Sequence, residues 1–167
     1  LREIAREERL LRDKPTELRA QFPAPLCGEM LTRWDMVSAV PDILITNTSM
    51  LNVILMRDNE EQIFEQTRKW LRASSDNEFV LVVDELHGYR GTQGTEVALV
   101  IRNLLSRLNL EPDSRQLRCL ATSASLDGNE GLEYIEQFFG VSRASFSVIP
   151  GQPFSAGATL PIPLPMV

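Results

Sequence analysis

The chain has 167 residues, of which 43% are hydrophobic and 24% charged, a composition that suits one globular domain with a single core. Acidic residues number 23 against 17 basic ones, and the net charge of -6 excludes a nucleic-acid-binding module that relies on a broad basic face. Cys27 and Cys119 have no further Cys or His at metal-ligand spacing, so neither a zinc site nor a disulfide framework is predicted.

Membrane insertion is not indicated by the sequence. No apolar run reaches the ~18 residues that a membrane span needs, and the N-terminus is charged from its second residue, unlike a secretory signal. A cytoplasmic location is therefore the default expectation. Because the chain begins with Leu1 and ends in an irregular proline-rich stretch, we expect it to be part of a longer parent chain.

Three regions follow one another along the chain. Residues 1–27 are predicted to be a charged lead-in, helical or irregular, that Pro15 interrupts. Residues 28–150 form the predicted domain, which opens with an irregular stretch and one short helical turn around Arg33–Val37. Residues 151–167 are rich in proline and glycine and are predicted to be a linker or tail.

From Pro41 onward, apolar runs typical of strands alternate with segments whose apolar residues have helical spacing. Residues 79–83 are apolar at every position, which favours a central parallel strand covered on both faces. The alternation predicts an α/β fold with a mainly parallel sheet and helices on both faces. We expect strands at 42–45, 79–83, 116–122 and near 145–149, and helices at 50–56, 59–73, 95–109 and near 129–139.

Polar residues follow three of these strands, namely Thr46–Asn47, Asp84–Glu85 and Thr122–Ser123. In open α/β sheets reactive groups gather at the carboxyl ends of the strands, so one edge of the sheet is predicted to carry them. Purely structural roles exist as well, because Asn47 can cap a helix and Ser123 can close a turn.

Asp84 and Glu85 are adjacent carboxylates directly after an apolar strand, where they repel each other unless a cation or water shares the site. Phosphate hydrolysis supplies such a cation. One carboxylate can hold Mg²⁺ through water while the other orients the attacking water toward the γ-phosphate. The alternative is a solvated acidic turn.

Three segments together resemble motifs of superfamily 2 DEAD/DEAH-box helicases. Residues 82–87 resemble the Walker B or DExH box, residues 121–126 resemble the Ser-Ala-Thr motif, and residues 41–51 resemble motif Ib, all in the family's order. Residues 84–94 are similar in particular to helicases of the MrfA type and to relatives in bacterial defence systems. The resemblance implies the later part of a first RecA-like motor domain, a P-loop NTPase fold, without its P-loop strand.

The resemblance also implies roles for individual residues in an ATP-dependent helicase or translocase acting on DNA or RNA. Asp84 would bind the Mg²⁺ of Mg-ATP through water, and Glu85 would position the hydrolytic water. His87 would hydrogen-bond toward Ser123 or its neighbours, although a lone histidine on a loop can also be a half-buried polar residue. Thr46 and Asn47 would lie near the phosphate backbone of a bound strand. The coupling motif would consist of Thr122, Ser123, Ala124 and Ser125.

Two departures from the family pattern limit this interpretation. The coupling motif ends in Ser125 where many members have Thr, a change that keeps the hydroxyl. Neither Lys14 nor Lys69 follows a glycine, so the chain has no Gly-x-x-x-x-Gly-Lys phosphate-binding loop. By itself the chain is therefore expected to be inactive, and to depend on a P-loop segment and a second RecA-like domain of its parent.

Two alternatives stay open at this stage. One is a degenerate RecA-like interaction module without ATPase activity, which the missing loop and the acidic charge both allow. The other is a carboxylate metallohydrolase, for which the sequence offers no further cluster that would complete a two-metal site. Tyr89 and Arg90 can contact nucleic acid or merely pack, and they are not included among the predicted site residues.

Overall fold

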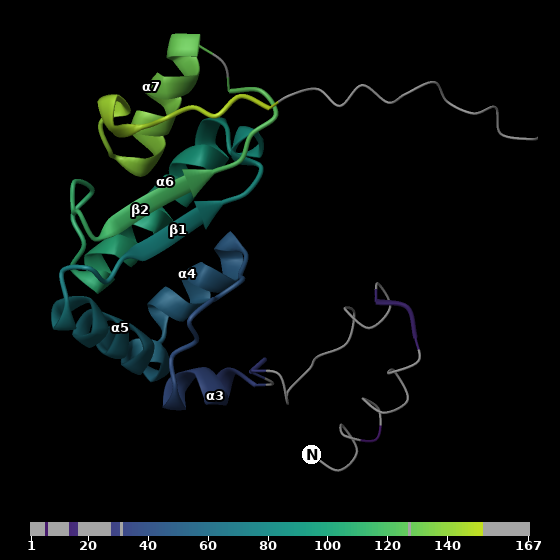
Figure 1. Ribbon diagram of the computed structural model, residues 1–167, viewed down its shortest axis with the longest axis vertical. Coiled ribbons are helices and arrows are strands. Elements are labelled where there is room, and N and C mark those ends of the chain that lie inside the picture. Colours follow the sequence, from purple (N-terminus) through teal and green to yellow (C-terminus); the bar gives the residue numbers. More distant parts are fainter. Residues whose placement is uncertain (1–5, 7–13, 17–27, 31, 127, 152–167) are drawn as a thin grey trace, which may run out of the picture.

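A computed structural model describes residues 6, 14–16, 28–30, 32–126 and 128–151 (Figure 1). The predictions for the lead-in, for Cys27 and for the proline-rich tail fall outside these residues. The described part contains a mixture of helices and a small parallel sheet, which is compatible with the predicted α/β class. No helix in this part is long and apolar enough to cross a membrane.

The sheet consists of two parallel strands, β1 (Phe79–Val83) and β2 (Leu117–Ala121), both of which were predicted. Phe79 pairs with Leu117 and Val83 pairs with Ala121, so the two strands end level with each other. The connection between them is α6 (Gly91–Leu108). Parallel strands need such a crossover because a tight turn cannot join them.

The hydrophobic core lies between one face of the sheet and the helices. α6 supplies its centre, because its apolar residues recur at helical spacing and face both the sheet and the neighbouring helices. α4 (Thr48–Met56), α5 (Glu61–Ala73) and α7 (Gly128–Phe139) all contact α6. The largest fully buried apolar side chains are Phe139 and Leu86.

Before α4 comes the short helix α3 (Arg33–Ser38), which matches the predicted turn and packs against α5. Arg33 Nε lies 3.1 Å from Glu60 Oε1, joining α3 to the 3-10 turn η2 (Asp58–Glu60) in front of α5. Glu60 is 1% exposed, and its Oε2 has no hydrogen-bond partner among the described residues. A buried carboxylate depends on its ion pair, so Arg33 holds α3 in place.

Two of the predicted strands are not formed. Residues 42–45 have no strand partner, and residues 145–149 give only the end of the 3-10 turn η4 (Arg143–Ser145) followed by irregular chain. Both segments alternate or concentrate apolar residues as strands do, but a strand also needs a neighbour that accepts and donates its backbone hydrogen bonds. The described sheet provides none at these positions.

Helices on both faces of the sheet were also predicted, and the structure differs here too. Val80, Val82 and Leu120 point away from α6 and are exposed, Val82 by 60%. Within the described residues the helices cover one face of the sheet only. The apolar side chains of β1 on the other face are exposed to solvent. Helix α6 likewise begins at Gly91, four residues earlier than the sequence pattern indicates.

Candidate functional site

The carboxyl ends of β1 and β2 bring two predicted site segments together. Because Val83 pairs with Ala121, Asp84 and Thr122 leave the sheet side by side. Thr122 N donates to Val83 O at 3.1 Å, and Leu86 N donates to Thr122 O at 2.8 Å, so backbone pairing continues past the strands. The sheet thereby fixes the backbone on which both sets of polar side chains stand.

The Thr122 hydroxyl organises the two carboxylate residues. It donates to Asp84 Oδ1 in a short hydrogen bond and accepts from Glu85 N–H at 3.0 Å. Glu85 N also lies 3.1 Å from Asp84 Oδ1. The single O–H donor of the hydroxyl is used by Asp84, and one of its two acceptor lone pairs is used by the Glu85 N–H. Thr122 is therefore a positioning residue for Asp84 and Glu85, a finer role than the sequence assigned to it.

Glu85 occupies an unusual backbone conformation, with φ 52° and ψ 46°. The left-handed region is sparsely populated by residues other than glycine, and it costs on the order of 1 kcal/mol. The next residue, Leu86, is fully buried in the core and begins the 3-10 turn η3 (Leu86–Gly88). The buried leucine and the Thr122 contacts hold this turn, so the Glu85 side chain remains exposed beside Asp84.

His87 stands between the carboxylates and the segment after β2. Its Nδ1 lies 3.3 Å from Ala124 N and 3.1 Å from Glu85 Oε2. One nitrogen cannot accept and donate at once, so these contacts are alternatives. With the proton on Nε2, Nδ1 accepts from the Ala124 N–H; with a proton on Nδ1, it donates to Glu85. The expected contact with a neighbour of Ser123 is thus present as one of two geometries.

Residues that the sequence prediction left aside also reach this edge. Arg90 Nη2 lies 3.3 Å from Ser125 Oγ, joining the loop after η3 to the end of the coupling motif. Tyr89 faces inward instead: its ring packs 6.3 Å from that of Phe138, and its carbonyl accepts from the Tyr134 hydroxyl. Burial raises the pKa of the Tyr134 hydroxyl, which keeps it a donor. Arg90 belongs to the site by contact, and Tyr89 to the core.

The donor set at this edge suits a hydrated Mg²⁺. Asp84 Oδ1 is held by Thr122, and Oδ2 makes no hydrogen bond within the described part of the chain. Mg²⁺ takes oxygen ligands and keeps several waters, so one oriented and exposed carboxylate is what the protein has to supply. No three His, Cys, Asp or Glu side chains converge among the described residues, so a cage made only of protein ligands is not present there.

Thr46 and Asn47 lie in a different setting from the Asp84–His87 box. Asn47 caps α4, its Oδ1 accepting from Met50 N at 2.8 Å, while Thr46 is exposed. The helix-capping role that was open for Asn47 is therefore present. Both residues line a groove of about 550 Å³ that has a mostly apolar wall. The groove is lined by Arg33, Met36, Leu44, Ile45, Thr46, Asn47, Met50 and Ile54.

Known proteins with similar sequences include a Druantia protein and two ATP-dependent helicases. Druantia protein DruE of Escherichia coli is 46% identical over 127 residues, which is 74% of this chain. The uncharacterized ATP-dependent helicase MJ1574 of Methanocaldococcus jannaschii is 31% identical over 124 residues, 70% of the chain. ATP-dependent helicase HRQ1 of Saccharomyces cerevisiae is 32% identical over 77 residues, 46% of the chain. The chain is thus related to a Druantia protein and to ATP-dependent helicases.

The matched region is a small part of each relative. It spans 7% of DruE, 17% of MJ1574 and 7% of HRQ1. No family model matches the chain, and no solved structure matches it either. The relationship to helicases therefore rests on sequence identity, and the RecA-like fold stays a prediction.

Proposed function

We propose, from this relationship to ATP-dependent helicases, that the chain supplies the Mg-ATP hydrolysis box and part of the nucleic-acid track of an ATP-dependent helicase or translocase. The observation that carries the proposal is the Thr122 arrangement, in which one hydroxyl orients Asp84 and fixes the backbone of Glu85 at the carboxyl edge of the sheet. A solvated acidic turn requires no such order. The superfamily 2 assignment and its RecA-like motor domain belong to this proposal.

Asp84 is the residue that would hold Mg²⁺ through water. The bound ion would neutralise charge on the β- and γ-phosphates of ATP. Thr122 donates to Oδ1, and this contact turns Oδ2 toward solvent, where a hydrated cation can be reached. The chain's own contribution is the fixed direction of one carboxylate.

Glu85 is the residue that would orient and polarise the hydrolytic water. Its left-handed backbone sets its side chain beside Asp84, and its Oε2 contacts His87 Nδ1 at 3.1 Å. A carboxylate without an arginine or lysine partner is able to accept a proton from water, which a carboxylate locked to a guanidinium does poorly. No lysine or arginine ion pair involves Glu85 in the described residues.

His87 and Arg90 would link hydrolysis to the segment 122–125. His87 Nδ1 lies within hydrogen-bond distance of both Ala124 N and Glu85 Oε2, and Arg90 contacts Ser125. A change at Glu85 during hydrolysis would therefore reach the chain after β2 through His87, and Arg90 would join the loop after η3 to the same segment. Thr46 and Asn47 would contact the sugar-phosphate backbone, where hydroxyl and amide groups position a strand without reading its sequence.

The decisive experiment is Glu85→Gln in the full-length parent, with Glu96→Gln on the exposed side of α6 as a matched control. Loss of the general base is expected to lower nucleic-acid-stimulated ATP hydrolysis by at least about 100-fold, while ATP binding persists. The control is expected to keep the parental rate. A Glu85→Gln rate within twofold of the parent would contradict the role of Glu85, and a parent that hydrolyses no ATP would favour the interaction module.

A further inference from the structure

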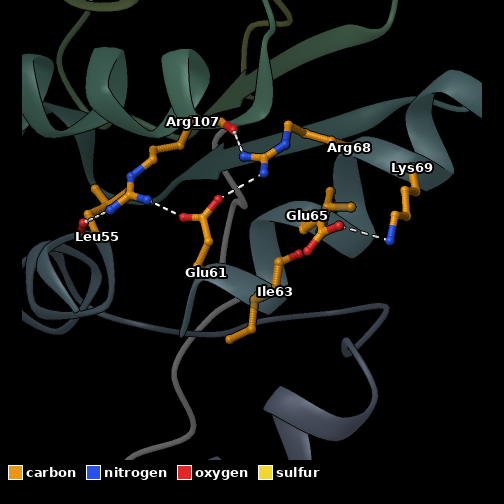
Figure 2. Close-up of polar contacts among 8 residues, drawn as sticks. Leu55, Glu61, Ile63, Glu65, Arg68, Lys69 and Arg107 are labelled. Atoms are coloured by element: carbon orange, nitrogen blue, oxygen red, sulfur yellow. Dashed lines mark hydrogen bonds and ion pairs between the residues drawn. The ribbon is translucent and has the colours of Figure 1, made fainter. Parts of the chain in front are cut away.

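A cluster of one carboxylate and two arginines lies away from the Asp84–His87 box, where three helices converge (Figure 2). Glu61, at the start of α5, accepts from Arg68 Nη2 at 2.8 Å and forms a short ion pair with Arg107 Nη1. Arg107 Nη2 donates to Leu55 O at 2.5 Å, and Arg68 Nη1 donates to Arg107 O at 2.7 Å. We call these four residues the Glu61 clamp.

The Glu61 clamp fastens the C-terminal end of α4 to that of α6. Leu55 lies in the last turn of α4, where the helix carbonyls lack partners within the helix and carry partial negative charge. The Arg107 guanidinium satisfies one of these carbonyls with a charge-assisted hydrogen bond. It also stacks 5.3 Å from the centre of the Phe64 ring, which limits its freedom to move.

The N-terminal end of α4 has no comparable charged contact with another element in the described part of the chain. The segment 42–45 in front of it forms no strand, and Ile43 and Ile45 are 81% and 93% exposed. The Asn47 cap binds α4 itself at Met50 and ties it to no other element. The fully buried residues of α4, Ile54 and Leu55, lie near its C-terminal end, while Leu51 is only partly buried against the core.

A helix held at one end behaves as a lever. α4 is 9 residues long, which corresponds to roughly 13 Å, so a rotation of about 10° at the clamp moves Thr46 and Asn47 by about 2 Å. Such a displacement is enough to break hydrogen bonds to a phosphate group. The other partner in the clamp, α6, begins at Gly91 directly after the loop of the Asp84–Arg90 segment.

We propose that the Glu61 clamp positions Thr46 and Asn47 relative to Asp84 and Glu85, and so tunes how nucleic-acid binding stimulates ATP hydrolysis. The proposal rests on the proposed function. Its residues are positioning residues, since none of them stands at the box or at Thr46 and Asn47. Directional contacts to a helix carbonyl and to a carboxylate define an orientation of α4, which apolar packing alone specifies less sharply.

The chain contains a matched control in the same helix. Glu65 pairs with Lys69 one turn further along α5 at 2.9 Å, and both side chains are more than half exposed (Figure 2). That pair joins neighbouring turns of one helix, so it positions no other element. Glu61→Gln and Glu65→Gln remove the same charge from the same helix, and they differ in whether α4 is attached.

The experiment uses the full-length parent and measures ATP hydrolysis without nucleic acid and with increasing mixed-sequence single-stranded DNA or RNA oligonucleotide. For Glu61→Gln we expect the oligonucleotide concentration at half-maximal stimulation to rise by about tenfold, as for loss of a supporting contact behind a binding group. The rate without nucleic acid is expected to stay within about twofold of the parent. Glu65→Gln is expected to match the parent in both values. Arg107→Lys keeps the charge but loses the two-pronged guanidinium that contacts Glu61 and Leu55 O together. It serves as the second variant should Glu61→Gln not fold.

Several outcomes would overturn the proposal. An unchanged half-maximal concentration in Glu61→Gln would leave the clamp a purely structural feature. If the rates of ATP hydrolysis without and with oligonucleotide fell by the same factor, the variant would be generally destabilised. A parent that hydrolyses ATP without any response to either oligonucleotide would remove the nucleic-acid track along with the clamp's role. Normal stimulation in the parent and in Glu61→Gln would overturn the clamp alone.

Discussion

Two groups of interacting residues in this chain, the Glu61 clamp and the Asp84–His87 box, differ in how carboxylate charge is balanced. In the Glu61 clamp, the carboxylate lies between the guanidinium groups of Arg68 and Arg107 and pairs with both. Arg68 also donates a hydrogen bond to the Arg107 carbonyl. In the Asp84–His87 box, the Asp84 carboxylate accepts from neutral donors, the Thr122 hydroxyl and the Glu85 N–H, and the adjacent Glu85 carboxylate contacts His87 Nδ1. No lysine or arginine among the described residues forms an ion pair with Asp84 or Glu85.

The difference indicates what each cluster is for. A carboxylate already paired with two arginines has no capacity left for a cation from outside, and its loss leaves two guanidinium groups facing each other. An oriented carboxylate beside a second carboxylate, neither paired with a lysine or arginine among the described residues, carries charge that a hydrated metal ion can neutralise. Order without charge balance is what the proposed role of the box requires, and order with charge balance is what we expect of the clamp as internal support.

The strongest way to break this contrast is Thr122→Val, which disorders the box without removing a carboxylate. The variant loses the donor to Asp84 Oδ1 and the acceptor for Glu85 N–H, so both carboxylate residues lose their fixed direction. We expect nucleic-acid-stimulated hydrolysis by the full-length parent to fall by about 10–100-fold. Thr122→Ser keeps the hydroxyl and is expected to retain most of the activity. Equal rates for the Ser and Val variants would show that the hydroxyl does not organise the box.

Arg107→Ala breaks the clamp and is expected to act on stability. It removes the ion pair to Glu61, the hydrogen bond to Leu55 O and the stacking on Phe64. Arg107 is partly exposed, so the free energy of unfolding is expected to fall by about 1–3 kcal/mol, below the range for fully buried pairs. Urea unfolding of the 167-residue chain measures this change.

Arg118→Ala provides the control for that measurement. Arg118 forms a bidentate pair with Glu78 at 2.7 and 3.0 Å, but both side chains are exposed, and solvent screens the attraction. The Glu78 pKa is lowered by the hydrogen bond from Arg118, which shows contact without burial. We expect little change in the urea midpoint. Equal losses for Arg107→Ala and Arg118→Ala would contradict the special status of the clamp.

Sequence patterns predicted those elements whose formation depends on residues close together in the sequence. The apolar run at 79–83 and the helical spacing at 59–73 and 129–139 gave elements that the structure confirms. The pair Asp84–Glu85 was identifiable because two carboxylates after an apolar strand need an explanation. The sequence prediction placed the start of α6 too late, because glycines such as Gly91 and Gly94 usually disfavour helices. Gly94 is needed within α6, since a Cβ there would meet the Tyr89 carbonyl.

The remaining features depend on contacts between distant residues. The Thr122 role requires the register between β1 and β2, which fixes residues 38 positions apart against each other. Glu61 and Arg107 are 46 positions apart, and nothing in either local pattern marks them as partners. The segment 42–45 has the composition of a strand, yet strand formation is decided by an available neighbour. Local sequence therefore gives the elements and the reactive groups, but not the contacts that orient them.

Titration of the partly buried Cys119 thiol compares the covered face of β2 with the open edge where Thr122 stands. It has the smallest effect on stability that we expect. Cys119 lies on β2 three residues before Thr122, and its side chain packs against the core rather than at the open edge. Burial raises the pKa of the Cys119 thiol to about 11, because the charged thiolate is disfavoured away from water. In the unfolded chain the thiol has its ordinary pKa of 9.0, so between these values the unfolded chain loses its proton first.

The contribution of Cys119 to stability is therefore fully present below pH 9 and is lost as the pH rises toward 11. After allowance for partial exposure, we expect a loss of at most about 1 kcal/mol at pH 10. Urea unfolding at pH 8 and pH 10 would compare a Cys27→Ser chain with one that also carries Cys119→Ala, so that other titrating groups cancel. The difference between the two chains is expected to shrink at pH 10. A difference independent of pH would mean that the Cys119 thiol is as well solvated as the groups at the open edge, and that the cover on this face of β2 ends before residue 119.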